Sequence, residues 1–261
     1  MKKSIIAVLL AMVLVFSLAA CGGDDSEKSG ADAEKVTYKV GTEPTFPPFD
    51  TTDEEQNIVG LDMDLIKAIG EDQGFEVTFE NLSFDGLVPA LKAGNIDIIA
   101  AGMNKDDKDR QAQVDFSDAY YESKLMVAVT ADNETIKSVD DLTKDMKVAA
   151  QTGTTGANKT QKLQEAGKIK EAVILNGLDT AMLQLINGDV SAVINDKPVT
   201  EAYMKKQPDK IKMVGKPLNA ENYGFAVQKG NTELLEKINA GLKNIKENGT
   251  FDKLVDEWFN K

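Results

Sequence analysis

One arginine is the residue in this sequence whose chemistry is hardest to replace. Arg110 stands in the stretch DDKDRQAQVDFSD and is the single arginine among the 30 lysine and arginine residues of the 261-residue chain. A guanidinium differs from an ammonium because its planar fork of N–H donors holds a carboxylate or phosphate through two parallel hydrogen bonds. Position 110 is therefore a candidate anion site, unless the arginine stands there by chance in a lysine-biased composition.

A glycine-rich turn, QTGTTGANKT, is a second candidate for binding an anion. Gly153 and Gly156 are too close together for a nucleotide-binding phosphate loop. The turn does follow a predicted strand and open a predicted helix, where backbone N–H groups are free to bind a carboxylate. Thr154 and Thr155 are the residues that would present those groups, although many strand-to-helix turns look the same.

Acidic and amide side chains end two apolar strands and suggest a site for a cation. Asp196 closes the run AVIND, and Asn104 follows the run IDIIAAGM in the same way. Open α/β sheets bind ligands at the carboxyl ends of their strands, so both side chains are candidates, together with the Gly102 carbonyl. The alternative for Asp196 is that it caps the next helix.

These pieces match the two charges of an α-amino acid. Arg110 and the threonine turn can hold a carboxylate, while Asp196, Asn104 and the Gly102 carbonyl can hold an ammonium. Phe46 and Phe84 lie in or beside the loops PTFPPF and LSFDG. From there the two rings can cover the apolar stem of such a ligand.

The composition excludes several other kinds of chemistry. The chain has no histidine and one cysteine, which removes histidine-dependent nucleophilic catalysis, histidine metal sites and thiolate metal sites. We therefore expect neither a metal nor a cofactor. The net charge of −13 argues against nucleic acid, whose binding requires a basic patch.

The N-terminus has the features of an export signal. Residues 1–20 combine two early lysines with an apolar run too short for a comfortable membrane span, which indicates a signal peptide. The sequence LAAC resembles the bacterial lipoprotein signal, which implies lipidation of Cys21 and anchoring on the outer side of the cell membrane. The alternative is a plain secretory signal with an unpaired cysteine. Residues 21–35 are rich in Gly, Ser and acids and are predicted to form a flexible tether.

The rest of the chain alternates strands and helices, which predicts an α/β fold of two units. Strands are predicted at 36–40, 75–82, 96–103, 122–130, 146–152, 171–176, 191–196 and 211–215. Helices are predicted at 60–74, 84–94, 155–167, 179–189 and 198–206, and in two amphipathic pieces after residue 231. The candidate site residues fall at the ends of these strands or in the loops that follow them.

Over residues 36–261 the sequence resembles the extracellular solute-binding proteins of polar amino-acid ABC transporters. The matching stretches include GTEPTFPPF, GLDMDL, FDGLVPALKAGNIDIIAAGM, QTGTTG, GDVSAVINDKP and ENGTFDKLVDEWF. The resemblance is to the branch that binds glutamine, basic amino acids or cystine. It implies a periplasmic-binding-protein-like type II fold, in which 36–127 plus 218–261 form one lobe and 128–217 the other. Two strands would join the lobes as a hinge.

The resemblance also assigns roles to single residues. It implies that Arg110 and the Thr155 N–H take the α-carboxylate, and that Asp196, Gly102 and Asn104 take the α-ammonium. Phe46 and Phe84 would sandwich the side chain, whose polar end Glu43 and Gln151 would contact. The loop from Gly102 to Arg110 is one residue longer than is common in such proteins, and Glu43 stands where many carry aspartate. Glu43 can also be read as a solvated loop acid.

The expected function is that of a monomeric, lipid-anchored receptor that binds a polar L-amino acid and delivers it to a permease. No covalent chemistry is needed for this. The rival hypotheses are a dehydratase-like enzyme on the same scaffold and a ligand-sensing module of a membrane receptor. The first would need a positioned acid or base, and the second is usually fused to a membrane and signalling segment.

Overall fold

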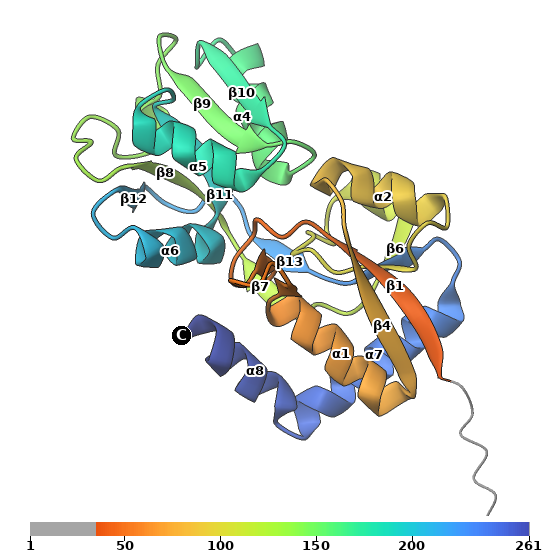
Figure 1. The fold of residues 1–261 in the computed structure, drawn as a ribbon. Coiled ribbons are helices and arrows are strands. Elements are labelled where there is room, and N and C mark those ends of the chain that lie inside the picture. Colours follow the sequence, from red (N-terminus) through yellow and green to blue (C-terminus); the bar gives the residue numbers. More distant parts are fainter. Residues whose placement is uncertain (1–34, 261) are drawn as a thin grey trace, which may run out of the picture. The chain divides into compact units, whose positions relative to one another are not determined.

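Two five-stranded sheets carry the fold, and a computed structural model describes it for residues 35–260 (Figure 1). The predicted signal peptide at 1–20 and Cys21 lie outside the described residues. Each sheet, with the helices on its faces, forms one α/β lobe. The predicted α/β class is confirmed. The apolar residues recur with the helical period in some segments and with the strand period in others, so helices and strands bury their apolar sides against each other in shared cores.

The first sheet is mostly parallel at one side and antiparallel at the other. Its strand order is β4 (Phe75–Asn81), β1 (Val36–Thr42), β5 (Ile98–Ile99), β14 (Ala226–Gln228) and β6 (Val114–Phe116). Helices α1 (Leu61–Gln73) and α7 (Thr232–Glu247) pack on one face, and α2 (Phe84–Lys92) packs on the other. The predicted helix at 60–74 is confirmed, and it ends at Gly74, whose φ of 77° suits glycine.

The second sheet repeats this arrangement. Its strand order is β10 (Glu171–Leu175), β9 (Lys147–Gln151), β11 (Ala192–Asp196), β8 (Leu125–Thr130) and β12 (Ile211–Val214). Helices α5 (Leu178–Asn187) and α6 (Lys197–Lys206) cover one face, and α4 (Thr155–Glu165) covers the other. Because β9, β10 and β11 are parallel, the residues that follow them meet at one edge of the sheet.

A short strand pair lies in the two segments that run between the sheets. β7 (Tyr121–Ser123) pairs antiparallel with β13 (Glu221–Tyr223). The single strand predicted at 122–130 is therefore two strands, with a break at Lys124. β8 belongs to the second sheet and begins at Leu125, three residues before the predicted start of the second lobe at 128.

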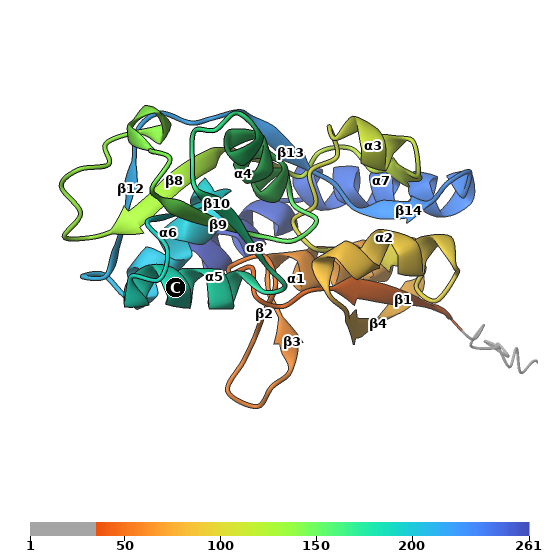
Figure 2. The same ribbon diagram turned by 90° about the horizontal axis from the view of Figure 1, so that it is seen from above.

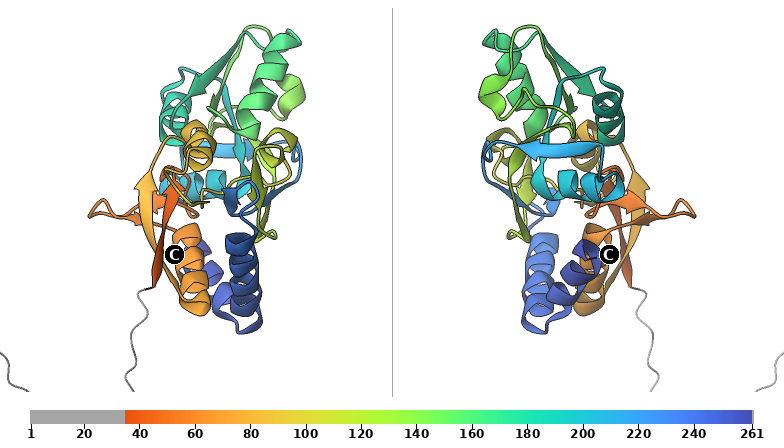
Figure 3. Two further views of the ribbon diagram at one scale, coloured as in Figure 1. Left: turned by 90° about the vertical axis from the view of Figure 1, so that its right-hand side faces the viewer. Right: turned by 90° about the vertical axis from the view of Figure 1, so that its left-hand side faces the viewer.

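The remaining elements lie around the first sheet. They are the hairpin of β2 (Thr51–Thr52) and β3 (Ile58–Val59), the short helix α3 (Lys108–Gln111), and the C-terminal helix α8 (Thr250–Phe259). In the second lobe, a 3-10 turn at Val139–Asp141 follows β8. The hairpin projects from the lobe in Figure 2, and Figure 3 shows α8 packed beside α1 and α7. Within residues 35–260, no helix has both the length and the apolar character needed to cross a membrane.

The strand predicted at 96–103 was too long. β5 pairs with its neighbours only at Ile98 and Ile99, and the chain then leaves the sheet. Ala100 and Ala101 remain buried, so the apolar run reflects burial rather than strand pairing. Gly102 then turns the chain with a φ of 52°, and this exit leads directly into the candidate site.

Candidate ligand-binding site

A small cavity of about 10 Å³ lies where residues from both sheets meet. Its lining consists of Phe46, Phe84, Gly102, Asn104, Arg110, Gln151, Thr154, Thr155, Asp196 and Glu221. The structure therefore brings together nine of the ten residues predicted for the site. Glu43 joins them through Gln151, and Glu221 is an addition that the sequence did not suggest.

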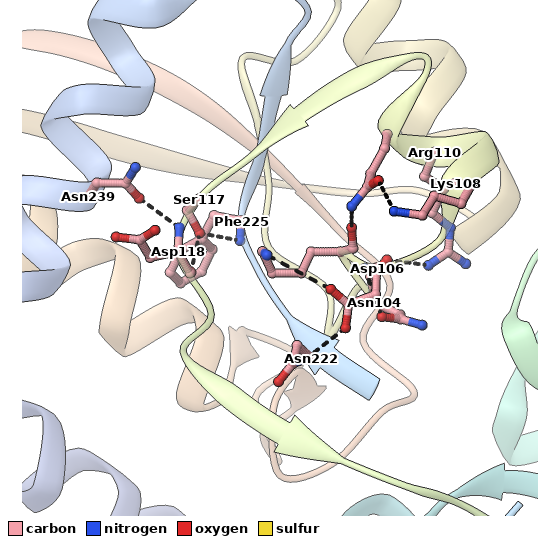
Figure 4. Close-up of polar contacts among 11 residues, drawn as sticks. Asn104, Asp106, Lys108, Arg110, Ser117, Asp118, Asn222, Phe225 and Asn239 are labelled. Atoms are coloured by element: carbon pink, nitrogen blue, oxygen red, sulfur yellow. Dashed lines mark hydrogen bonds and ion pairs between the residues drawn. The ribbon is translucent and has the colours of Figure 1, made fainter. Parts of the chain in front are cut away.

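Arg110 is fixed on α3 with its guanidinium turned into the cavity. Asp107 caps this helix by accepting hydrogen bonds from the N–H groups of Asp109 and Arg110, each at 3.0 Å. The Arg110 side chain is buried, and its Nη2 donates to the Gly153 carbonyl at 2.8 Å. Its Nη1 donates to the Asn104 carbonyl at 3.3 Å (Figure 4). Burial lowers the pKa of the Arg110 guanidinium. The negative charges of Asp107, Glu221 and Asp196 partly offset this lowering.

Two phenylalanine rings, Phe46 and Phe84, line the cavity, and Arg110 contacts one of them. Its guanidinium lies over the Phe84 ring, 5.2 Å from the centroid, which is a cation–π geometry. Phe46 also lines the cavity, with its ring centroid 6.2 Å from that of Tyr223. A Cβ on Gly102 would come within 2.5 Å of the Phe46 ring, so glycine is what allows this ring to pack so closely.

The loop around Arg110 is ordered by its own polar side chains. Asn104 accepts a hydrogen bond at Oδ1 from the Asp106 N–H at 3.0 Å, and Asp106 accepts one from Asn222 at 2.7 Å (Figure 4). The carboxylates of Asp106 and Asp107 thus hold the loop in place. These hydrogen bonds fix the backbone of the loop between Gly102 and Arg110, and so they place the Arg110 side chain at the cavity.

The threonine turn opens α4, as predicted. Thr154 caps the helix by accepting from the Ala157 N–H at 3.0 Å, and its hydroxyl donates to the Gln151 carbonyl at 2.7 Å. Thr155 is the first residue of the helix, where backbone N–H groups have no partner within the helix itself. The positive end of the α4 dipole therefore lies at the same cavity as Arg110.

Asp196 ends β11 and is the principal acid of the cavity. Its Oδ1 accepts hydrogen bonds from Ser123 Oγ at 2.9 Å and from Tyr223 OH at 2.6 Å. Asp196 occupies the N-cap position of α6, but among the described residues its side chain makes no capping hydrogen bond. Asp196 is therefore the N-cap residue of α6 by position, as the alternative interpretation expects, but its carboxyl bonds to Ser123 and Tyr223 instead of to the helix N–H groups. Burial, and then the charge of Glu221, raise the pKa of Asp196 to about 7.

Glu43 and Gln151 connect the two sheets beside the cavity. Gln151 Nε2 donates to Glu43 Oε2 at 2.8 Å, and Thr45 Oγ1 donates to the same carboxylate at 2.8 Å. Glu43 is only 7% exposed, which contradicts the interpretation as a solvated loop acid. Burial raises the pKa of Glu43, and its hydrogen bonds from Gln151 and Thr45 partly offset this.

A buried acid beneath the cavity is also absent from the prediction. Asp62, on α1, accepts at Oδ2 from the Gly102 N–H at 2.8 Å and from Tyr120 OH at 2.7 Å. The motif GLDMDL gave no local signal for it, because an acid in the first turn of a helix is commonly exposed, and the burial of Asp62 is seen only in the structure. Within residues 35–260, no group of acids or cysteines has the arrangement of a metal site.

Two α/β lobes with mixed five-stranded sheets, and a polar cavity lined from both, define a periplasmic-binding-protein fold of type II. The chain belongs to the bacterial extracellular solute-binding proteins, family 3, which it matches over residues 38–261. The predicted family and fold are thereby confirmed.

Individual relatives are similar along the whole chain. A probable histidine-binding protein of Neisseria gonorrhoeae is 35% identical, covering 100% of this chain and 97% of its own. An ABC transporter arginine-binding protein of Escherichia coli K12 is 32% identical, covering 99% of both chains. The structure of an ancestral arginine-binding protein bound to arginine matches with a TM-score of 0.82 and 42% identity, covering 86% of this chain and 99% of that one. All three are named as binding proteins rather than enzymes.

Proposed function

We propose that this protein binds a polar L-amino acid outside the cell and delivers it to the permease of an ABC transporter. The observation that carries the proposal is one cavity with a buried guanidinium and a helix N-terminus as its positive groups and a buried aspartate as its negative group. An α-amino acid presents the complementary carboxylate and ammonium. The names of the relatives, which include histidine and arginine binders, point to the same class of ligand.

Each residue of the predicted site has a role in this proposal. Arg110 and the N–H groups at Thr154 and Thr155 bind the α-carboxylate, and Asp196 with Asn104 and the Gly102 carbonyl binds the α-ammonium. Phe46 and Phe84 flank the side chain, and Glu43 and Gln151 contact its polar end. Arg110 would exchange its hydrogen bond to the Gly153 carbonyl for two hydrogen bonds to the ligand. The new bonds are stronger, because the acceptor is then a charged carboxylate and no longer a neutral carbonyl.

The ligand is proposed to hold the lobes together. Because Arg110 lies between β5 and β6 of the first sheet and Gly153 follows β9 of the second, groups of both lobes already contact each other at the cavity. We propose lobes of 36–127 plus 218–261 and of 128–217, a hinge at β7 and β13, and a monomeric protein. A ligand that contacts both lobes favours their closed arrangement, because it binds that state more strongly.

A thermal-shift screen tests the proposed function directly. The twenty standard amino acids, ornithine and cystine are each added to the purified protein, and the melting temperature is measured. A ligand at about 100 times its Kd contributes about 2.7 kcal/mol, or a rise of roughly 5–10 °C for a protein of this size. One compound or a few chemically related ones should produce the rise. No shift with any compound contradicts the proposal.

We also propose that Cys21 is lipidated and anchors the protein to the cell membrane. The support is the LAAC sequence after an apolar run and the family's extracellular character. Replacing Cys21→Ser should move the protein from the membrane fraction to the soluble extracytoplasmic fraction and abolish fatty-acid labelling. Unlabelled, soluble wild-type protein would instead favour a plain secretory signal.

A further inference from the structure

Glu221 is a second buried carboxyl in the cavity, and its position follows from the β7–β13 pair. It is 1% exposed, lines the cavity, and stands opposite Ser123 in the strand register. Tyr223 is two residues further on, so its side chain leaves β13 on the same face. Because the hydroxyls of Ser123 and Tyr223 both donate to Asp196 Oδ1, this face of the strand pair brings Glu221 beside Asp196.

Cations near the two carboxyls are committed to other partners. Arg110 donates to the carbonyls of Gly153 and Asn104, and Lys197, next to Asp196 in the chain, bonds with Glu201. Glu221 Oε1 accepts from Asn219 Nδ2 at 2.9 Å. The pair is thus held by neutral donors in a buried place, where two negative charges close together are unfavourable.

The titratable groups around the pair agree with this geometry. Burial, and then the charge of Glu221, raise the pKa of Asp196 to about 7, against the hydrogen bonds from Tyr223 and Ser123. Burial, and then the charge of Asp196, raise the pKa of Tyr223 well above its ordinary value, so its hydroxyl remains a neutral donor. Arg110 is the cation that faces both acids, and it interacts with Asp107 as well.

We propose that Glu221 is a second carboxylate of the ammonium site, and that it shares one proton with Asp196 until a ligand binds. When the α-ammonium enters, its N–H groups donate to both carboxylates and the shared proton passes to the solvent. The pair changes from one negative charge to two while one positive charge arrives, so the site keeps its charge balance. This inference rests on the proposed function and identifies Glu221 as the residue that makes ligand binding depend on pH.

The direction of the pH effect follows from linkage. Because the pKa of Asp196 is raised before binding and the ammonium would lower it, the site binds the ligand best when this carboxyl is already ionised. Affinity should be highest above about pH 7 and should fall about tenfold per pH unit well below it, with release of close to one proton per ligand. Glu43 also has a raised pKa, so the wild-type pH profile alone does not identify the group.

Calorimetry on Glu221→Gln separates the groups. The probe is whichever of L-arginine, L-histidine, L-glutamine and L-cystine binds most tightly to the wild type. Titrations at about pH 6 and about pH 8, each in two buffers of different protonation enthalpy, give the Kd and the number of protons released. Glu221→Gln should release far fewer protons at the lower pH and bind about tenfold more weakly at the higher pH.

Two further variants complete the test. Glu122→Gln is the matched control, because Glu122 lies on β7 and is exposed, and it should behave as the wild type. Glu221→Asp keeps a carboxyl and should keep the proton release. A wild-type Kd and proton count in Glu221→Gln overturn the inference while the proposed function stands. If both Glu221 variants fail to fold, a wild type that releases no proton at about pH 6 overturns it. If no amino acid binds the wild type, the proposed function fails instead.

Discussion

Replacing Arg110→Lys is expected to lower the affinity for the amino-acid ligand by well over tenfold. The guanidinium presents two N–H groups in one plane, and in the structure they reach two different carbonyls at 2.8 and 3.3 Å. A lysine offers a single ammonium, which cannot hold both oxygens of a carboxylate in a parallel pair. Loss of one charged hydrogen bond costs about 1.5–3 kcal/mol, which is roughly ten- to a hundredfold in Kd.

The measurement is isothermal calorimetry with the ligand identified by the thermal-shift screen. Lys108→Ala is the matched control, because Lys108 is on the same short helix and exposed, and it should change the Kd less than twofold. The melting temperature of both variants reports on folding separately from binding. Near-wild-type binding by Arg110→Lys would show that the guanidinium does not hold the carboxylate.

Much of the fold could be predicted because the decisive patterns are local. The alternation of apolar and polar residue types in the VTYKV segment of β1, and the helical stripe of α1 with Gly74 at its end, depend on neighbours a few residues apart. The elements that were missed are short. β6, β13 and β14 have three residues each, and such segments become strands only because a distant strand pairs with them.

The site shows the same division between local and distant information. Asp196 was recognisable because it ends an apolar strand, and Arg110 because its side-chain type occurs once. Glu221 sits in NAENYG, where nothing local distinguishes it from a surface acid. Its burial follows from the register that sets it opposite Ser123, about a hundred residues earlier in the chain.

The exchange of a proton for an ammonium would also give the site a selectivity of its own. A ligand that has a carboxylate but no α-ammonium would leave Asp196 and Glu221 without a cation, so the pair would keep its proton. Such a compound would gain only the Arg110 contacts. Under this proposal, discrimination between amino acids and other carboxylates would depend on the acids more than on the arginine.

Gly60→Ala is expected to lower the free energy of unfolding by about 4 kcal/mol, more than any other variant proposed for this protein. Gly60 has a φ of 147°, and an added Cβ would come within 2.1 Å of the Phe49 carbonyl oxygen. The backbone conformation and the forced displacement each cost about 1–3 kcal/mol. The displaced loop cannot move freely, because the Leu61 N–H is hydrogen-bonded to the Pro48 carbonyl at 2.9 Å.

Urea unfolding measures the loss of stability, and Gly74→Ala is the control. Gly74 has a φ of 77°, and no atom of the described residues lies within 4 Å of a Cβ added there. This control variant should lose only about 1 kcal/mol of stability. Equal losses in the two variants would show that the loop accommodates the methyl group.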